Sequence, residues 1–349
     1  MPTYALLVSP SANRVYAQAA PALTVAELGV LDATVLEGRL GPAETVQLAG
    51  VPYVTCTGEL TETDLRHVAD VSTAFALFER DGGTLRPVAL QPLDCLDDDL
   101  LTILKYQGKT NEVFTRLLLN VTAASSASGR RMLTDRLRVL DPLCGRGTTL
   151  NQALMYGWHA CGIDVDERDF EAYAAFLTRW LKDKRLKHTA DSARLRRDGR
   201  TIGRRYDARF ALSKEAWAAG DDIRAGVLLA DTRETAALLK ARSIDVLATD
   251  APYGVQHGSR SDAGLRRSPL ELLTEALPAW VEVLRPGAAV GIAVNVRTCP
   301  RAGLLALLAQ VGLDPLDGPA YRGFEHRVDQ AIVRDIVVAR KPSATRETS

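Results

Sequence analysis

From about residue 105 onward, short apolar segments alternate with amphipathic ones, and this alternation restricts the possible folds more than any other feature. Apolar residues at 170, 173, 174 and 177 follow the i, i+3, i+4, i+7 spacing of a helix. A second helix begins with a capping box at 268–271. Buried strands are expected at 137–141, 159–164, 225–230, 244–249, 288–295 and 335–340. The sequence therefore predicts an α/β fold whose mostly parallel sheet is covered by helices.

The first ninety residues show a different pattern, in which four strand-like runs flank two helix-like ones. Strands are expected at 4–9, 33–39, 51–57 and 72–79, and helices at 11–29 and 61–71. We therefore expect a small acidic α+β domain over 1–90 and a Pro- and Asp-rich linker over 91–104. The larger domain follows over 105–342, and 343–349 form a frayed tail.

The net charge of zero conceals a strong asymmetry. Residues 1–100 carry 5 Lys and Arg against 14 Asp and Glu, whereas the remainder carries 38 against 29. The most basic stretch, 179–209, has 12 Lys and Arg against 4 Asp and Glu. It overlaps an insert at 183–222, between the second and third strands of the larger domain, in which Asp198-Gly199 predicts a turn of a hairpin or loop. This insert is the best candidate for contact with a polyanion, with a solvated surface as the alternative.

Composition excludes several classes of protein. Hydrophobic residues make up 46% and charged residues 25%, which is typical of a globular chain. No run approaches the ~18 apolar residues of a membrane span, and the N-terminus lacks the pattern of a secretory signal, so we expect a cytoplasmic protein with no membrane contact. The 5 cysteines contain no C-x-x-C pair and are expected to be free thiols. The 5 histidines have no metal-ligand spacing, so no metal is expected.

A glycine-containing turn follows the first strand of the larger domain: Asp141-Pro142-Leu143-Cys144-Gly145-Arg146-Gly147-Thr148-Thr149. Glycine lets the backbone approach a ligand, and open α/β sheets bind ligands at the carboxyl ends of their strands. A nucleoside triphosphate is disfavoured because no lysine follows Gly147. A dinucleotide is disfavoured because Leu150 stands where G-x-G-x-x-G requires its third glycine.

Carboxylates stand after the next two strands. Asp164 ends the second strand, where a carboxylate can accept both ribose hydroxyls of a nucleoside. Asp231 follows the third strand, where it would lie beside an adenine and accept its amino group. Each acid taken singly is also explained as a helix N-cap. In this order, however, the acids and the glycine turn fit a site for S-adenosyl-L-methionine, which is the cofactor that we expect.

The fourth strand ends in Thr249-Asp250-Ala251-Pro252-Tyr253-Gly254. With the glycine turn, this segment resembles the class I amino-methyltransferases, and in particular the RNA methylase family that includes the tRNA guanosine N2-methyltransferases. That family carries D-P-x-C-G-x-G-T and D-P-P-Y-G motifs, and the resemblance covers about residues 105–340. It implies a Rossmann-like methyltransferase domain with a mostly parallel seven-stranded sheet. Two positions depart from the family pattern, since Ala251 replaces a proline and Leu143 a phenylalanine.

The resemblance also implies a reaction, the transfer of methyl to an exocyclic base nitrogen of RNA, with guanine N2 in tRNA as the expected target. Such an amine is a poor nucleophile because its lone pair is delocalised into the base. Asp250 and the carbonyl of Ala251 would accept its N–H bonds, Pro252 would stiffen the turn, and Tyr253 would stack on the base. Cofactor binding falls to Thr110, Asn111, Asp141, Leu143, Cys144, Gly145, Gly147, Thr148, Asp164, Val165, Asp231 and Thr232.

RNA, expected to be tRNA, is the predicted partner. Its candidate contacts are Arg196, Arg197, Arg204 and Arg205 in the insert, and His257 and Arg260 after the turn at 250–254. Other substrates stay open: adenine N6 or cytosine N4 of DNA, a protein amide, or a small-molecule amine. A cofactor-binding scaffold without activity is the alternative from a different class. Because the N-terminal domain is small and acidic, an activating partner subunit that captures the substrate is a further possibility.

Overall fold

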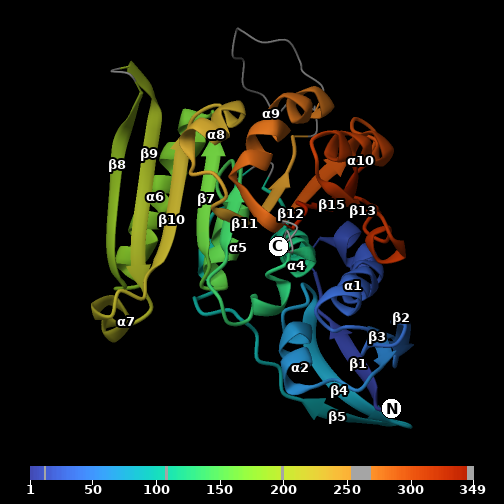
Figure 1. Ribbon diagram of the computed structural model, residues 1–349. Helices are drawn as coiled ribbons and strands as arrows, with labels where there is room; N and C mark the ends of the chain where they lie inside the picture. The colour runs from blue at the N-terminus through green and yellow to red at the C-terminus, as the bar shows by residue number, and fades with distance from the viewer. Residues whose placement is uncertain (12, 107–108, 198–199, 253–268, 344–349) are drawn as a thin grey trace, which may run out of the picture.

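The computed structural model describes residues 1–11, 13–106, 109–197, 200–252 and 269–343, without the side chains of Arg197 and Arg200, and these residues form two sheets (Figure 1). The first sheet is antiparallel and has five strands in the order β2-β3-β1-β4-β5. Their bounds are β1 Thr3–Val8, β2 Glu44–Leu48, β3 Val51–Thr57, β4 Ala74–Asp81 and β5 Thr84–Val88.

Two helices accompany this sheet, α1 Arg14–Thr34 and α2 Glu62–Ala69. The strand expected at 33–39 is wrong: α1 continues to Thr34, and Val35 and Leu36 stay buried before the chain turns. Glu37 and Gly38 make this turn with positive φ angles. The prediction also missed β2 and β5, because both are short edge strands in which no residue is buried.

The second sheet has ten strands, of which nine follow the order β13-β15-β12-β11-β6-β7-β10-β9-β8 while β14 pairs with β15. The parallel strands are β6 Arg138–Asp141, β7 His159–Asp164, β10 Ile223–Leu229, β11 Ile244–Asp250 and β12 Leu284–Asn295. The antiparallel additions are β8 Lys187–Arg197, β9 Arg200–Ala211, β13 Asp314–Leu316, β14 His326–Arg327 and β15 Val333–Arg340.

The expectation of a mostly parallel seven-stranded sheet therefore needs correction, because the sheet is mixed and larger. The basic insert is the main reason: β8 and β9 form a long antiparallel hairpin that pairs with the outer edge of β10. Pairing with β9 satisfies the outward-facing backbone N–H and C=O groups of β10, and β8 becomes the edge strand of the sheet. Figure 1 shows this hairpin as an extension of the sheet on the side away from β12.

Helices cover both faces of the second sheet. One apolar cluster contains residues of α4 Glu112–Ser125, α5 Thr148–Met155 and α6 Glu167–Asp183. The other contains residues of α9 Pro269–Val283 and α10 Arg301–Gln310. Strand β11 serves both, since Val246 and Ala248 belong to the first cluster and Leu247 to the second. Short helices are α3 Asp99–Thr102, α7 Lys214–Ala218 and α8 Thr235–Leu238, with 3-10 turns η1 Gly129–Arg131, η2 Thr232–Glu234 and η3 Pro319–Tyr321.

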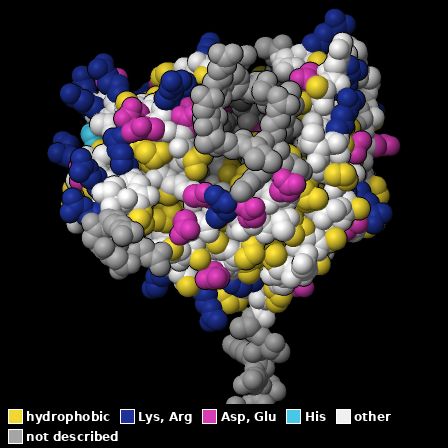
Figure 2. Space-filling view, turned by 90° about the horizontal axis from the view of Figure 1, so that it is seen from above, with side chains coloured by type: hydrophobic (Ala, Val, Ile, Leu, Met, Phe, Trp, Pro, Cys, Tyr) yellow, Lys and Arg dark blue, Asp and Glu magenta, His cyan; other side chains and the backbone are white. Residues whose placement is uncertain are grey.

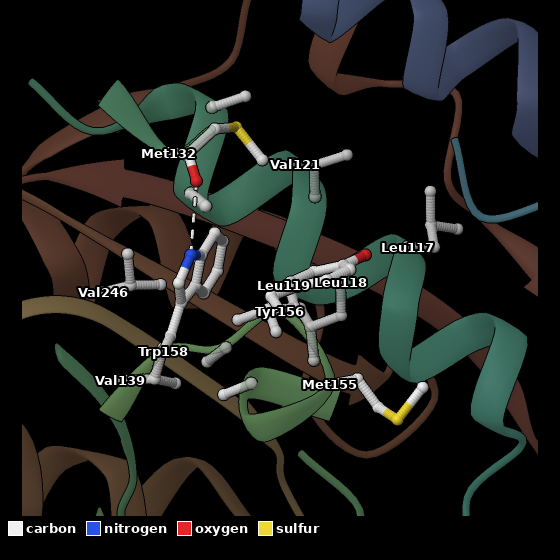
Figure 3. Close-up of a cluster of buried hydrophobic side chains, with 14 of the residues drawn as sticks. Leu117, Leu118, Leu119, Val121, Met132, Val139, Met155, Tyr156, Trp158 and Val246 are labelled. Atoms are coloured by element: carbon white, nitrogen blue, oxygen red, sulfur yellow. Dashed lines mark hydrogen bonds between the residues drawn. The ribbon is translucent and has the colours of Figure 1, made fainter. Parts of the chain in front are cut away.

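Helix α4 lies at the centre of the first cluster (Figure 3). Its leucines at 117–119 are almost fully buried, and Trp158 packs beside β6 and β11. The indole Nε1 of Trp158 donates to the carbonyl of Met132 over 3.2 Å, so the polar edge of this large side chain is satisfied within the core. Helix α4 also contacts β11 and β12, so it lies next to the strand that ends in Asp250.

A buried polar network joins the first sheet and its helices to α4. The carboxylate of Glu27 on α1 accepts hydrogen bonds from Ser72 N, from Ser72 Oγ and from Asn120 Nδ2 on α4. Asn120 Oδ1 in turn accepts from Tyr156 Oη over 2.7 Å. Burial raises the pKa of Glu27 to about 7 despite these donors.

Residues 91–104, which we expected as a linker, pack against the second sheet's helices. Leu100 of α3 is fully buried, and its carbonyl accepts from Asn151 Nδ2 on α5. Asp99 accepts from the indole of Trp180 on α6 over 2.8 Å.

Across the described ranges, no helix has both the length and the apolar character needed to cross a membrane.

Candidate functional site

The candidate site lies where the sheet order reverses around β6. The chain passes from β6 to β7 on one side and reaches β11 on the other, and ligands of open α/β sheets bind at such a point. Asp141 ends β6 and is buried, and its Oδ1 accepts from Leu143 N and from Thr249 Oγ1 on β11. Burial raises the pKa of Asp141 to about 6. Asp141 is therefore held in place by the neighbouring strand and by its own turn.

The glycine turn depends on two residues in the left-handed region. Gly145 has φ 48° and Gly147 has φ 77°, and Gly147 is the N-cap of α5. A Cβ on Gly147 would lie 2.5 Å from Cδ2 of the buried Tyr173 and closer still to Cε2. Gly145 N donates to Asp164 Oδ2 over 2.8 Å, so Asp164 at the end of β7 holds the turn against β7. Burial raises the pKa of Asp164 as well.

Two cavities open on either side of this turn. The larger, of about 310 Å³, is lined by Tyr106, Thr110, Asp141, Leu143, Cys144, Gly145, Arg146, Thr148, Thr149, Asp169 and Asp250. The smaller, of about 200 Å³, is lined by Pro142, Leu143, Asp164, Val165, Ala230, Asp231, Thr232, Arg233 and Leu272. Leu143 belongs to both linings, so the two cavities are neighbours.

Asp250, at the end of β11, faces the larger cavity in a fixed orientation. Its Oδ2 accepts from Thr110 Oγ1 over 2.7 Å and lies 3.5 Å from Nη2 of Arg334. Arg334 on β15 is only 7% exposed, and its guanidinium lies 4.4 Å from the ring centre of Phe114. Ala251 N donates to the carbonyl of Ala293 on β12, which ties the chain after Asp250 to the sheet.

Several predicted cofactor residues have local structural partners. Asn111 is the N-cap of α4 and accepts from Val113 N and Phe114 N. Asp231 caps η2 and forms an ion pair with Arg233, although it also lines the smaller cavity. Thr232 is buried, and its Oγ1 accepts from the indole of Trp280. Asn111 does not line either cavity, whereas Asp231 and Thr232 do.

The predicted residues that reach the larger cavity are Thr110, Asp141, Leu143, Cys144, Gly145, Thr148 and Asp250. Asp164 and Val165 reach the smaller one, and Val165 is 68% exposed there. Gly147 supports the turn through its conformation. Pro252 is exposed directly after Ala251. Tyr253, His257 and Arg260 lie outside the described residues.

Four of the predicted substrate contacts, Arg196, Arg197, Arg204 and Arg205, belong to the β8–β9 hairpin. Arg196 is exposed, whereas Arg204 forms ion pairs with Glu167 and Glu171 of α6. Arg205 is paired with Asp207 on the same strand. The side chain of Arg197 lies outside the described residues.

Sequence reasoning assigned no role to several side chains that line the larger cavity or hold Asp250, among them Tyr106, Asp169 and Arg334. Arg334 stands 84 positions after Asp250, and no local pattern connects the two. Arg146 lies inside the glycine turn, but the sequence motif predicted no function for its side chain. Among the described side chains, no group of three or more His, Cys, Asp or Glu could hold a metal ion.

No protein-family model and no curated protein matches the chain. Among solved structures, an rRNA methylase from Streptococcus thermophilus is 11% identical, with 68% of this chain and 100% of that chain covered and a TM-score of 0.36. Spermidine synthase from Thermotoga maritima is 15% identical, with 68% and 61% covered and a TM-score of 0.38. Geranyl diphosphate methyltransferase, solved with the ligand sinefungin, is 11% identical, with 60% and 75% covered and a TM-score of 0.32. Similarities at this level establish neither family nor function.

Proposed function

We propose that the chain is an S-adenosyl-L-methionine-dependent N-methyltransferase that acts on an exocyclic base nitrogen of RNA, with guanine N2 of tRNA as the target. One observation carries the proposal. Asp141, Asp164 and Asp250 end three neighbouring strands of the sheet and surround a glycine turn between two adjoining cavities.

The lining of these cavities fits the cofactor. The larger cavity has three carboxylates, Asp141, Asp169 and Asp250, and one guanidinium, Arg146. The methionine end of the cofactor carries two positive charges, on ammonium and sulfonium, and one carboxylate, so the charges are complementary. The smaller cavity presents the apolar side chains of Leu143 and Val165 to an adenine, beside the carboxylate of Asp164 for the ribose hydroxyls.

When bound, the cofactor supplies an electrophilic methyl group, and the chain has to orient the amine that attacks it. Asp250 is suited to accept an N–H of that amine, because Thr110 and Arg334 hold its carboxylate at the edge of the larger cavity. The anchored chain at Ala251 would supply its carbonyl as the second acceptor. Accepting both N–H bonds favours a pyramidal nitrogen and stabilises its developing charge.

The β8–β9 hairpin supports a nucleic acid as the substrate. Arg204 pairs with Leu229, the last residue of β10, so residues 200–203 of β9 extend beyond the carboxyl edge of the sheet where the cavities open. Figure 2 looks down on this edge and shows Lys and Arg side chains on the hairpin side, at the left, and also along the opposite side. The β8–β9 hairpin would contact phosphates of the nucleic acid while a base enters the larger cavity.

The test is methyl transfer from radiolabelled S-adenosyl-L-methionine to tRNA, rRNA, DNA and cell protein in parallel, followed by nucleoside mass spectrometry. We expect label in tRNA as N2-methylguanosine. Asp250→Ala should lower the transfer rate at saturating cofactor about 10²–10³-fold, since it removes one group aimed at the reacting nitrogen. Asp314→Ala removes an exposed carboxylate on β13 and is the matched control. This variant should transfer methyl at the wild-type rate.

Label in DNA or in protein, and not in RNA, would show that the labelled class of molecule is the substrate and would refute RNA as the substrate. Label that appears only after addition of cell extract would identify a required partner subunit. Absence of cofactor binding in calorimetry would refute the proposed function as a whole.

A further inference from the structure

Arg146 is the one Lys, Arg or His among the described residues that line the larger cavity. It stands between Gly145 and Gly147, so its backbone is fixed by the turn that positions the cavity wall. Its side chain is about one-third exposed, at 35%. A cation at this place faces a cavity whose other charged lining groups are carboxylates.

Two neighbours hold the guanidinium plane of Arg146. Its Nε donates to Asp169 Oδ1 on α6 over 2.8 Å. Its Cζ lies 4.9 Å from the ring centre of Tyr106, and Tyr106 Oη shares a hydrogen bond of 3.1 Å with Thr148 Oγ1. Part of the entropy loss that a flexible arginine suffers on binding a ligand has therefore already occurred.

The terminal edge of this guanidinium is available for a ligand. Of its five N–H donors, Nε is used by Asp169, and Nη1 and Nη2 make no hydrogen bond to the described residues. The terminal amino groups of an arginine form a planar fork that matches the two oxygens of a carboxylate. Within the larger cavity, Arg146 is the side chain suited to that task.

We propose that Arg146 binds the carboxylate of the cofactor's amino-acid end and makes the site select ligands that carry this carboxylate. The inference rests on the proposed function, because it assumes that the adenosyl cofactor occupies the two cavities. Tyr106 and Asp169 act as positioning residues for Arg146. The carboxylates of Asp141 and Asp250 remain for the positively charged parts of the same ligand.

The test compares two ligands that differ only in this carboxylate, S-adenosyl-L-homocysteine and its decarboxylated analogue 5′-deoxy-5′-(3-aminopropylthio)adenosine. Their dissociation constants are measured by calorimetry on the full chain. The wild type should prefer S-adenosyl-L-homocysteine. Arg146→Met should weaken S-adenosyl-L-homocysteine about 10–100-fold and change the analogue by less than about 3-fold, since a charged hydrogen-bond partner is lost for one ligand alone.

Arg179→Met is the matched control. Arg179 also donates its Nε to a carboxylate, that of Asp183 over 2.7 Å, but it lies on α6 outside both cavity linings. This variant should bind both ligands as the wild type does. Tyr106→Leu keeps the charge of Arg146 but removes its stacking partner, and it should weaken S-adenosyl-L-homocysteine selectively by a smaller factor.

Equal weakening of both ligands by Arg146→Met, or no weakening of either, would overturn the inference. So would a wild type that binds both ligands equally, a result that does not depend on how well the variant folds. A wild type that binds neither ligand would instead refute the proposed function. The two failures are thus distinguishable within one experiment.

Discussion

Replacing Gly147 by alanine tests whether the glycine turn is held by backbone conformation and by packing together. The left-handed conformation at φ 77° costs an L-residue about 1–2 kcal/mol. The new Cβ would also lie 2.5 Å from Cδ2 of Tyr173, whose side chain is fully buried and cannot swing into solvent. Overpacking of this kind adds about 1–3 kcal/mol. Gly147→Ala should therefore lower the free energy of unfolding by about 2–5 kcal/mol.

Gly145→Ala is the matched control for this prediction. Its φ of 48° is also positive, but a Cβ there meets only Asp169 Oδ2, at 4.0 Å. It should cost only the backbone contribution of about 1–2 kcal/mol. Urea unfolding followed by tryptophan fluorescence measures both, because Trp158 and Trp280 are buried in different clusters.

A double variant separates the two contributions to the cost of Gly147→Ala. In a Tyr173→Leu background the ring is absent, so Gly147→Ala should cost about as much as Gly145→Ala does in the wild type. If Gly147→Ala is no more destabilising than Gly145→Ala in the wild-type background, the packing argument is refuted.

Three further predictions concern buried polar groups. Burial raises the pKa of Glu27 from 4.5 to about 7, so its stabilising contribution is present below pH 4.5 and is lost as pH rises through 7. The difference in free energy of unfolding between wild type and Glu27→Ala should therefore shift by up to roughly 3 kcal/mol between pH 4 and 8. Urea unfolding at the two pH values measures this shift. Asn120→Ala removes partners of Glu27 and Tyr156 and should destabilise by about 1.5–3 kcal/mol, measured by the urea midpoint. Thr249→Val removes a hydrogen-bond donor to Asp141 and should raise the pKa of the Asp141 carboxyl above 6. More of this carboxyl is then protonated at pH 6.5, so calorimetry should show weaker cofactor binding at pH 6.5 that recovers at pH 8.5.

The local order of residues was enough to predict which carboxylates follow strand ends in the candidate site. Asp141, Asp164 and Asp250 each close an apolar run, and parallel strands bring their carboxyl ends to one edge of a sheet. The glycines of the turn were equally readable, because a strand-to-helix turn requires conformations that other residues avoid.

The N-terminal part shows where local patterns mislead. Residues 33–39 have the apolar composition of a strand, but burial against the first sheet extends α1 to Thr34 instead. The true strand β2 is polar and half-exposed, and its partner β3 stabilises it through backbone hydrogen bonds that no side-chain pattern records.

Tertiary structure decided which side chains surround the strand ends. Arg334 approaches Asp250 because β15 returns antiparallel beside β12, and Tyr106 and Asp169 meet at Arg146 from segments more than 20 residues to either side. These contacts depend on the order of strands and on helix packing, which non-local pairings determine. Strand ends and turn conformations could be inferred from neighbouring residues, whereas the partners of Asp250 and Arg146 required the folded sheet.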